Sequence, residues 1–239
     1  MMKFTCAIFD MDGLMFDTEN LFIRAFIDHI GPAIGYRFTR EGILKLVGLN
    51  HRSALRMFPE AFPGCPADCD TCLGMFRAWM KDYIAENGIP VKPGLRELLD
   101  YLKENGIPCA VATSSDAGTA MGYLENAGLT AYFARVITGD KVTHGKPDPE
   151  IFLLAMQALG ASDPGKCVVF EDSRNGLLAG ANGGFPVIVV PDVMDPTAAL
   201  PGKCYAKVSR LDEAIGLLQC LCRGGRLVKS NMVYTMRKH

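Results

Sequence analysis

The chain has 239 residues, of which 49% are hydrophobic and 21% charged, and its formal net charge is −1. This length accommodates one large domain or two modest ones with a buried core. The balanced charge argues against nucleic acid as the main partner, because such proteins carry a basic surface. No apolar run is long enough for a membrane span or a secretory signal. We therefore expect a cytoplasmic protein whose nine cysteines are mostly free thiols.

Short apolar segments in the sequence are predicted to be the strands of a parallel sheet. In chain order they cover residues 4–9, 108–112, 135–138, 167–170 and 186–190. Each is apolar on both faces, which is typical of strands that helices cover on both sides. Amphipathic patterns between these segments predict helices. Alternating strands and helices indicate an α/β fold with a doubly wound, Rossmann-like sheet.

One long stretch, residues 18–88, breaks this alternation, since it contains helical patterns and no convincing strand. It is too long for a simple crossover between two strands, so we expect an inserted helical subdomain. The predicted boundaries are 1–16 with 90–222 for the Rossmann-like core and 17–89 for a helical cap. Residues 223–239 form a locally basic C-terminal tail, which we expect to be solvated or frayed.

Polar residues follow the predicted strands at the sheet edge where ligands of such folds bind. Asp10 and Asp172 offer the hard oxygen ligands that Mg²⁺ prefers, and a carboxylate such as Asp10 can itself accept a phosphoryl group. Lys146 would neutralise phosphate charge, and Thr113 with the amides after it would hold phosphate oxygens. Asp12 can protonate the leaving oxygen and later activate water. The combination predicts phosphoryl transfer.

The same residues resemble the four ordered motifs of the haloacid dehalogenase-like superfamily. The motifs are Asp10-Met11-Asp12-Gly13 within residues 9–19, then Thr113-Ser114, then Lys146 in Gly145-Lys146-Pro147, and finally Glu171-Asp172-Ser173. The resemblance covers about residues 3–220, and the helical insertion lies where this family carries its cap. The phosphatase and β-phosphoglucomutase-like branch is the most similar.

The resemblance implies a chemical role for each of these positions. Asp10 would be the nucleophile that forms an aspartyl-phosphate, and Asp12 the acid and base. Mg²⁺ would be bound by Asp10, the Asp12 carbonyl and Asp172. Thr113, Ser114 and Lys146 would bind the phosphate. These roles are expectations for this chain.

Three other assignments are less direct. Glu171 is either a metal ligand or a residue that supports one, and the sequence leaves both open. Residues 48–52 resemble the substrate-specificity loop of the family's cap. His51 and Arg52 are therefore candidates to contact the phosphate or sugar hydroxyls of a substrate.

Phe22 bears on whether the chain is a phosphatase or a mutase. β-Phosphoglucomutases of this family place a histidine in the first cap helix, and Phe22 occupies the matching position here. We therefore expect a Mg²⁺-dependent phosphatase acting on a small organic phosphate, such as a sugar phosphate. A β-phosphoglucomutase-type phosphomutase is the alternative. The expected partner is a small-molecule phosphate ester, and the expected state is a monomer.

A different kind of protein is suggested by Cys65, Cys69 and Cys72, which have the spacing of an iron–sulfur site in radical S-adenosylmethionine enzymes. Thiolates of this kind could also hold a structural zinc. The cysteines fall in the helical insertion, however, and no fourth ligand is evident. We interpret them as free thiols. A catalytically silent binding protein is the remaining alternative, which the intact acids and lysine disfavour.

Overall fold

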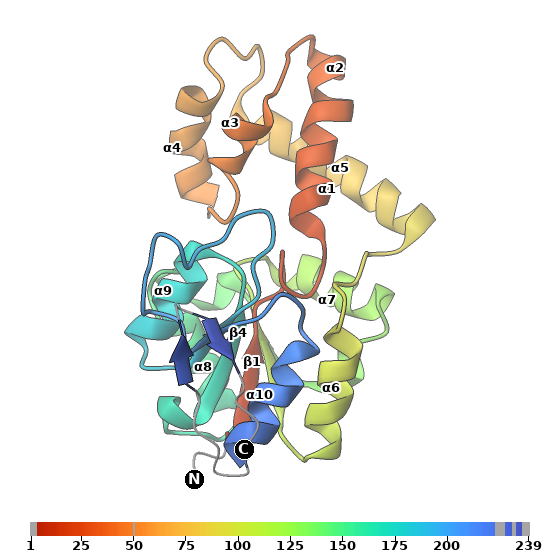
Figure 1. Ribbon diagram of the computed structural model, residues 1–239. Coiled ribbons are helices and arrows are strands. Elements are labelled where there is room, and N and C mark those ends of the chain that lie inside the picture. Colours follow the sequence, from red (N-terminus) through yellow and green to blue (C-terminus); the bar gives the residue numbers. More distant parts are fainter. Residues whose placement is uncertain (1–3, 50, 223–227, 231–232, 236–239) are drawn as a thin grey trace. The chain divides into compact units, whose positions relative to one another are not determined.

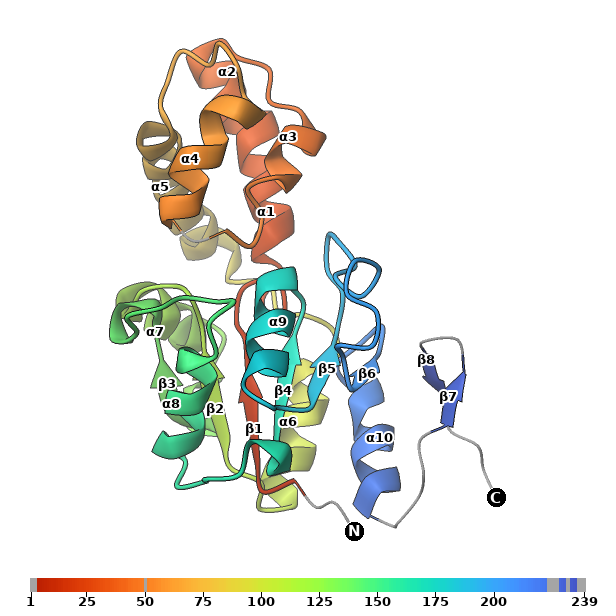
Figure 2. The ribbon, with the colours of Figure 1, turned by 90° about the vertical axis from the view of Figure 1, so that its left-hand side faces the viewer.

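The computed structural model describes residues 4–49, 51–222, 228–230 and 233–235. The chain divides into two compact units. The first, which we call the core unit, comprises Met1–Phe16 and Val91–His239, and the second, the cap unit, is Asp17–Pro90. Both are drawn in Figure 1 and Figure 2. No described helix has the length and apolar character needed to cross a membrane.

The core unit is built on a six-stranded sheet in which every neighbouring pair of strands is parallel, with the order β3-β2-β1-β4-β5-β6. Its strands are β1 (Cys6–Phe9), β2 (Cys109–Ala112), β3 (Phe133–Ile137), β4 (Cys167–Glu171), β5 (Val187–Val189) and β6 (Ala206–Lys207). In the centre, Phe9 of β1 is paired with Val111 of β2 and with Phe170 of β4. The predicted α/β doubly wound fold is confirmed.

Helices cover both faces of this sheet. Figure 1 and Figure 2 show α8 (Glu150–Ala158) and α9 (Arg174–Asn182) on one face, and α6 (Leu95–Glu104) with α10 (Glu213–Cys222) on the other. The remaining helical segments of the core unit are α7 (Ala117–Asn126) and the short turns η2 (Thr130–Tyr132), η3 (Gly139–Lys141) and η4 (Pro164–Lys166). Because both faces are covered, β1, β2 and β4 are buried along their whole length.

The edges of the sheet differ from the prediction. We expected every strand to be apolar on both faces, but β3 is an edge strand in which Ala134 and Arg135 are exposed. The opposite edge, β6, was not predicted, because two residues are too few to show a period. In the tail, β7 (Val228–Ser230) and β8 (Val233–Thr235) pair antiparallel, which we did not expect. The rest of residues 223–239 lies outside the described residues.

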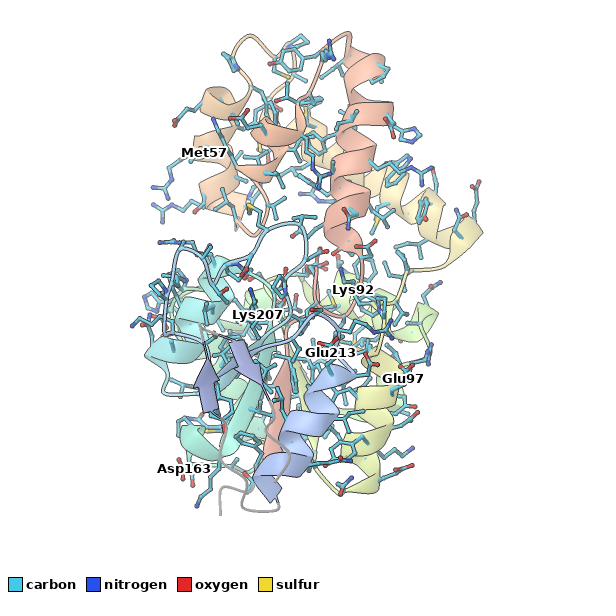
Figure 3. The ribbon with its side chains drawn as sticks, viewed as in Figure 1. Met57, Lys92, Glu97, Asp163, Lys207 and Glu213 are labelled. Atoms are coloured by element: carbon cyan, nitrogen blue, oxygen red, sulfur yellow. The ribbon has the colours of Figure 1, made fainter. Side chains whose placement is uncertain are left out.

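A partly buried ion pair fixes the segment that leads into α6. Lys92, labelled in Figure 3, donates from Nζ to Oδ1 of Asp192 at 2.6 Å, and the two side chains are 17% and 5% exposed. The backbone amide of Lys92 also donates to the carbonyl of Met15 at 2.8 Å. This segment is therefore tied to the loop after β1 and to the loop after β5.

The cap unit is helical, and its described residues contain no strand. Its elements are α1 (Thr18–Ala25), the π-helical turn η1 (Phe26–Ile30), α2 (Gly31–Ile34), α3 (Arg40–Leu44), α4 (His51–Ala61) and α5 (Cys69–Asn87). Its core is aromatic. The ring of Phe38 lies 5.0 Å from that of Phe26, 4.8 Å from Phe62 and 6.4 Å from Phe58, measured between ring centroids. Large rings thus supply the apolar contact that stabilises these short helices.

Candidate active site

Three adjacent strands end in the residues of the candidate site. Asp10 follows β1, Thr113 follows β2, and Glu171 ends β4 with Asp172 directly after it. Since β1 lies between β2 and β4, these residues meet at one edge of the sheet. The backbone amide of Asp10 donates to the carbonyl of Phe170 at 3.0 Å, which keeps Asp10 in register with β4.

The buried acidic group at this edge consists of Asp10, Glu171 and Asp172. One carboxylate oxygen from each residue lies within 4.8 Å of the others, and the residues are 7%, 0% and 7% exposed. Within the described part of the chain, no other set of three histidine, cysteine or acidic side chains is close enough to hold a metal ion. Carboxylate oxygens at this spacing fit a hard divalent cation such as Mg²⁺.

Lys146 is buried among these acids. Its Nζ donates to Oδ1 of Asp10 at 2.5 Å and to Oε1 of Glu171 at 2.7 Å, and it lies 4.8 Å from the centroid of the Phe152 ring. The loop that carries Lys146 is held by Glu150 at the start of α8, which accepts the backbone amides of Thr143 and His144. A charged lysine is thus fixed against the candidate nucleophile.

Glu171 is held through both of its carboxylate oxygens. Oε1 accepts from Lys146, while Oε2 accepts from the amide of Asp172 at 2.9 Å and from the amide and hydroxyl of Ser173 at 2.8 and 3.0 Å. The carboxylate of Glu171 also occupies the space beside Gly176 of α9. A Cβ on residue 176 would overlap this carboxylate. These contacts orient Glu171 toward Lys146 and the start of α9.

The charges of this group shift the pKa of its members. Burial raises the pKa of Asp10 to about 7, while the nearby Lys146 opposes the rise and Glu171 adds to it. For Lys146, burial alone would lower the pKa, but attraction to Asp10 and Glu171 outweighs it and raises the pKa above the ordinary lysine value. Lys146 therefore stays charged, and Asp10 takes up a proton more readily than an ordinary aspartate does.

Asp12 lies across a turn from Asp10 and faces the loop after β2. Gly13 adopts a φ of 81°, which permits the turn. Oδ2 of Asp12 accepts from the hydroxyl of Ser115 at 2.7 Å and, at a longer 3.4 Å, from that of Thr113. Thr113 is fully buried. Asp12 thus accepts hydrogen bonds from two hydroxyl groups of the loop after β2.

Comparison with known proteins identifies the family. A family model described as haloacid dehalogenase-like hydrolase matches residues 7–190, which is more than half of the chain. The chain belongs to the haloacid dehalogenase-like hydrolases. This confirms the resemblance seen in the sequence motifs.

Individual relatives of this haloacid dehalogenase-like hydrolase are similar over most of their length. A phosphorylated carbohydrates phosphatase from Thermotoga maritima is 33% identical over 89% of this chain and 97% of its own. The pyrophosphatase PpaX from Bacillus velezensis is 32% identical over 76% of this chain and 81% of its own. The crystal structure of CbbY from Rhodobacter sphaeroides in complex with phosphate has a TM-score of 0.72 and 25% identity, covering 88% of this chain and 96% of that one.

Two of the candidate residues belong to the cap unit of this hydrolase. His51 and Arg52 begin α4 and are exposed. The Nε2 atom of His51 lies 2.7 Å from Oδ1 of Asp70 in α5, which is also exposed. Ser114, a candidate phosphate ligand in the core unit, is exposed as well. The interaction of His51 with Asp70 had no signal in the sequence.

The cysteines of the hydrolase agree with the free-thiol interpretation. The cysteines whose side chains the structure describes are all free: Cys6, Cys65, Cys69, Cys72, Cys109, Cys167 and Cys204. Among them, Cys65, Cys69 and Cys72 do not form a metal-holding group. In this structure the three thiols do not converge on one point.

The sequence did not reveal three residues that shape the site, namely Ser115, Ser173 and Gly176. Ser115 is separated from its partner Asp12 by 103 positions, so no local pattern could indicate their contact. Ser173 was noted only as part of a motif, although its hydroxyl both binds Glu171 and caps α9 by accepting the amide of Gly176. For Gly176, the one signal in the sequence was its position three residues after Ser173, a residue type that often caps helices.

Proposed function

We propose that this chain is a Mg²⁺-dependent phosphatase that hydrolyses small organic phosphates, including sugar phosphates, through an aspartyl-phosphate on Asp10. The observation that carries the proposal is the contact of Lys146 Nζ with Asp10 Oδ1 at 2.5 Å inside a buried acidic group. A carboxylate nucleophile needs both an adjacent cation and a metal site in order to approach an anionic ester. The Thermotoga maritima relative, a phosphatase of phosphorylated carbohydrates, supports the substrate class.

Mg²⁺ would be held by Asp10, by Asp172 and by the backbone carbonyl of Asp12. When bound, it would neutralise charge on the phosphoryl oxygens. Glu171 belongs to the same buried group, but its oxygens already accept hydrogen bonds from Lys146 and from the amides that follow it. We therefore propose that Glu171 positions Lys146 and supports the metal ligands, which is the second of the two roles that the sequence left open.

The reaction proceeds in two displacements. An oxygen of Asp10 attacks phosphorus while Lys146 balances the charge on the phosphoryl oxygens, and Asp12 gives a proton to the leaving alkoxide. Asp12 then takes a proton from a water molecule as that water attacks the phosphorus of the aspartyl-phosphate, which returns Asp10 to its free form. Thr113 and the amides after it, Ser114 included, would hold the phosphate between these steps. His51 and Arg52 remain candidates for contacts with the rest of the substrate.

Water is the proposed acceptor because of what surrounds Phe22. Its ring lies 4.5 Å from that of Phe26 and 4.9 Å from that of Phe76, between centroids, within the aromatic interior of the cap unit. A phenyl ring held there offers no proton carrier for a sugar hydroxyl. A β-phosphoglucomutase-type activity is the second candidate, since mutases share this fold.

Phosphate release from a panel of sugar phosphates, with and without Mg²⁺, tests the proposal. We expect Mg²⁺-dependent release from several esters. The panel should also be run with a hexose bisphosphate activator, because conversion of a hexose 1-phosphate to its 6-phosphate without phosphate release would identify a mutase instead.

Replacing the nucleophile gives a second test. We expect Asp10→Asn to abolish turnover, because an amide oxygen does not form the acyl phosphate, while the far-ultraviolet circular dichroism spectrum stays that of the wild type. Turnover by the folded variant at the wild-type rate would show that Asp10 is not the nucleophile.

A further inference from the structure

Ser115 lies at the candidate site, yet none of the catalytic or binding roles assigned above uses its hydroxyl. Its Oγ donates to Oδ2 of Asp12 at 2.7 Å. Ser115 stands in the loop between β2 and α7, whereas Asp12 stands in the loop after β1. The contact therefore joins two loops at the carboxyl edge of the sheet.

The backbone of Ser115 is fixed from two sides. Its amide donates to Oγ1 of Thr113 at 3.0 Å, and its carbonyl accepts from the amide of Gly139 at 2.9 Å. Gly139 can approach this closely only because it lacks a side chain, since a Cβ there would overlap the carbonyl of Ser114. A hydroxyl on such a constrained backbone presents its proton in a defined place.

The carboxylate of Asp12 accepts the hydroxyl of Ser115 and, at the longer distance of 3.4 Å, that of Thr113. A carboxylate in a loop turns about two side-chain torsions, but a general acid acts only when it lies within hydrogen-bond reach of the leaving oxygen. We propose that Ser115 is a positioning residue for the proposed phosphatase reaction, and that its hydroxyl holds Asp12 in the orientation from which it protonates the leaving group. This inference rests on the proposed role of Asp12.

A leaving-group comparison separates this role from phosphate binding. The value of kcat/KM reports only the steps up to departure of the alcohol, so later hydrolysis of the aspartyl-phosphate does not affect it. An alkyl phosphate such as glycerol 2-phosphate needs the proton from Asp12 at that step. An aryl phosphate such as p-nitrophenyl phosphate releases a stable phenolate and needs it much less.

The experiment measures kcat/KM for both esters in the wild type and in Ser115→Ala, Ser115→Thr and Ser162→Ala. We expect Ser115→Ala to lower kcat/KM by about 10- to 100-fold for the alkyl ester and by far less for the aryl ester. Ser115→Thr, which keeps the hydroxyl, should restore most of the alkyl activity. The exposed Ser162, in the loop that precedes η4 and β4, serves as the matched serine-to-alanine control and should behave as the wild type. Inhibition by inorganic phosphate should be equal in all four proteins.

Other outcomes overturn the inference in distinct ways. Equal losses for both esters, together with weaker inhibition by phosphate, would make Ser115 a phosphate ligand. Asp12→Asn should also lower kcat/KM mainly for the alkyl ester. If it does so while Ser115→Ala lowers kcat/KM equally for both esters, the positioning role of Ser115 is refuted and the role of Asp12 as the acid stands. A wild type inactive on both esters, with Mg²⁺ present, would refute the proposed function itself. Circular dichroism and thermal melting of each variant identify a loss that is due to unfolding.

Discussion

Lys146 is a single cation shared by two carboxylates, and this sharing governs how Asp10 takes up protons. Asp10 and Glu171 both accept from Nζ, and Asp172 adds a third acid to the group. One ammonium cannot offset this much negative charge in a buried site. Without a metal ion, the least costly response is for Asp10 to hold a proton, in accord with its raised pKa of about 7.

This titration predicts how stability depends on pH in the metal-free protein. The pKa of Asp10 is about 7 in the folded chain and about 4 in an unfolded one. Between these values the folded chain binds a proton that the unfolded chain has lost, so the free energy of unfolding decreases as pH rises from about 4 to about 7. We expect thermal melts in EDTA to show a higher Tm at pH 5 than at pH 7.5.

Asp10→Asn is the control for this pH effect, because it removes the titrating group and keeps the shape. We expect the difference in Tm between pH 5 and pH 7.5 to shrink in this variant. Addition of Mg²⁺ should raise the Tm of the wild type more at pH 7.5 than at pH 5, since a bound cation needs the ionised carboxylate. An identical pH slope in wild type and variant would contradict the assignment of the raised pKa to Asp10.

Sequence reasoning at the residue scale reached those residues whose position follows from strand ends. Asp10, Thr113 and Asp172 come directly after apolar strands, so topology alone predicts that they meet at one edge. The exact partners could not be predicted in this way. The contact of Ser115 with Asp12 depends on the path of two loops. The hydrogen bonds of Glu171 to Lys146 and to the amides of Asp172 and Ser173 depend on side-chain rotamers.

The start of α9 shows how one helix end serves the site. Ser173 caps the helix by accepting the amide of Gly176 at 3.1 Å, and the same hydroxyl donates to Glu171. Gly176 leaves the space that the Glu171 carboxylate fills. The first turn of α9 thus fixes Glu171, and through it the position of Lys146.

We therefore expect Gly176→Ala to impair the reaction although alanine favours helices. The added methyl group would displace the carboxylate of Glu171 and shift Lys146, which should lower kcat/KM by about 100-fold. The matched control is Gly122→Ala within α7, where a Cβ meets nothing within 4 Å. That variant should keep full activity and gain about 0.5–1 kcal/mol in the free energy of unfolding, as measured by urea denaturation. Full activity in Gly176→Ala would show that the site tolerates a displaced Glu171.

Strands and helices were predicted best where burial requires a recognisable pattern of apolar residues. The central strands β1 and β2 are apolar throughout and β4 is apolar up to its last residue, Glu171, and the sequence located all three to within two residues at each end. The edge strands carry less information, because β3 has exposed positions and β6 pairs over only two residues. The π-helical turn η1 was not foreseen, since it changes the hydrogen-bond spacing without changing which residues are apolar.

At the scale of the whole molecule, each of the two units has its own core. The core unit is packed around a sheet of mostly aliphatic strands, whereas the cap unit is packed around aromatic rings centred on Phe38. Domains with separate cores can lose stability separately. The inserted helical region was expected from the long break in the strand pattern, but its aromatic packing could not be deduced, because the rings come from helices and loops that are far apart in the sequence.

Phe38→Ala should weaken the cap unit and leave the proposed metal site of the core unit in place. Phe38 is 4% exposed, and removal of its ring should cost about 3–5 kcal/mol. We expect amide hydrogen exchange to accelerate across residues 17–90, while Mg²⁺ binding measured by calorimetry stays near the wild-type affinity. Phe152→Ala, at a fully buried position beside Lys146, is the control expected to affect the metal site. Equal acceleration of exchange in both units of Phe38→Ala would show that they unfold as one.

The excess of acid over base in the site also has a thermodynamic consequence. Asp10, Asp12, Glu171 and Asp172 carry four negative charges when ionised, and Lys146 carries one positive charge, which leaves a formal charge of −3. An anionic ester entering such a site is repelled until a divalent cation is present, so cation and ester must bind cooperatively. By thermodynamic linkage, this coupling acts equally in both directions. If Mg²⁺ increases the affinity for phosphate by a given factor, phosphate increases the affinity for Mg²⁺ by the same factor. Free phosphate, the product, would then retain the metal ion between turnovers.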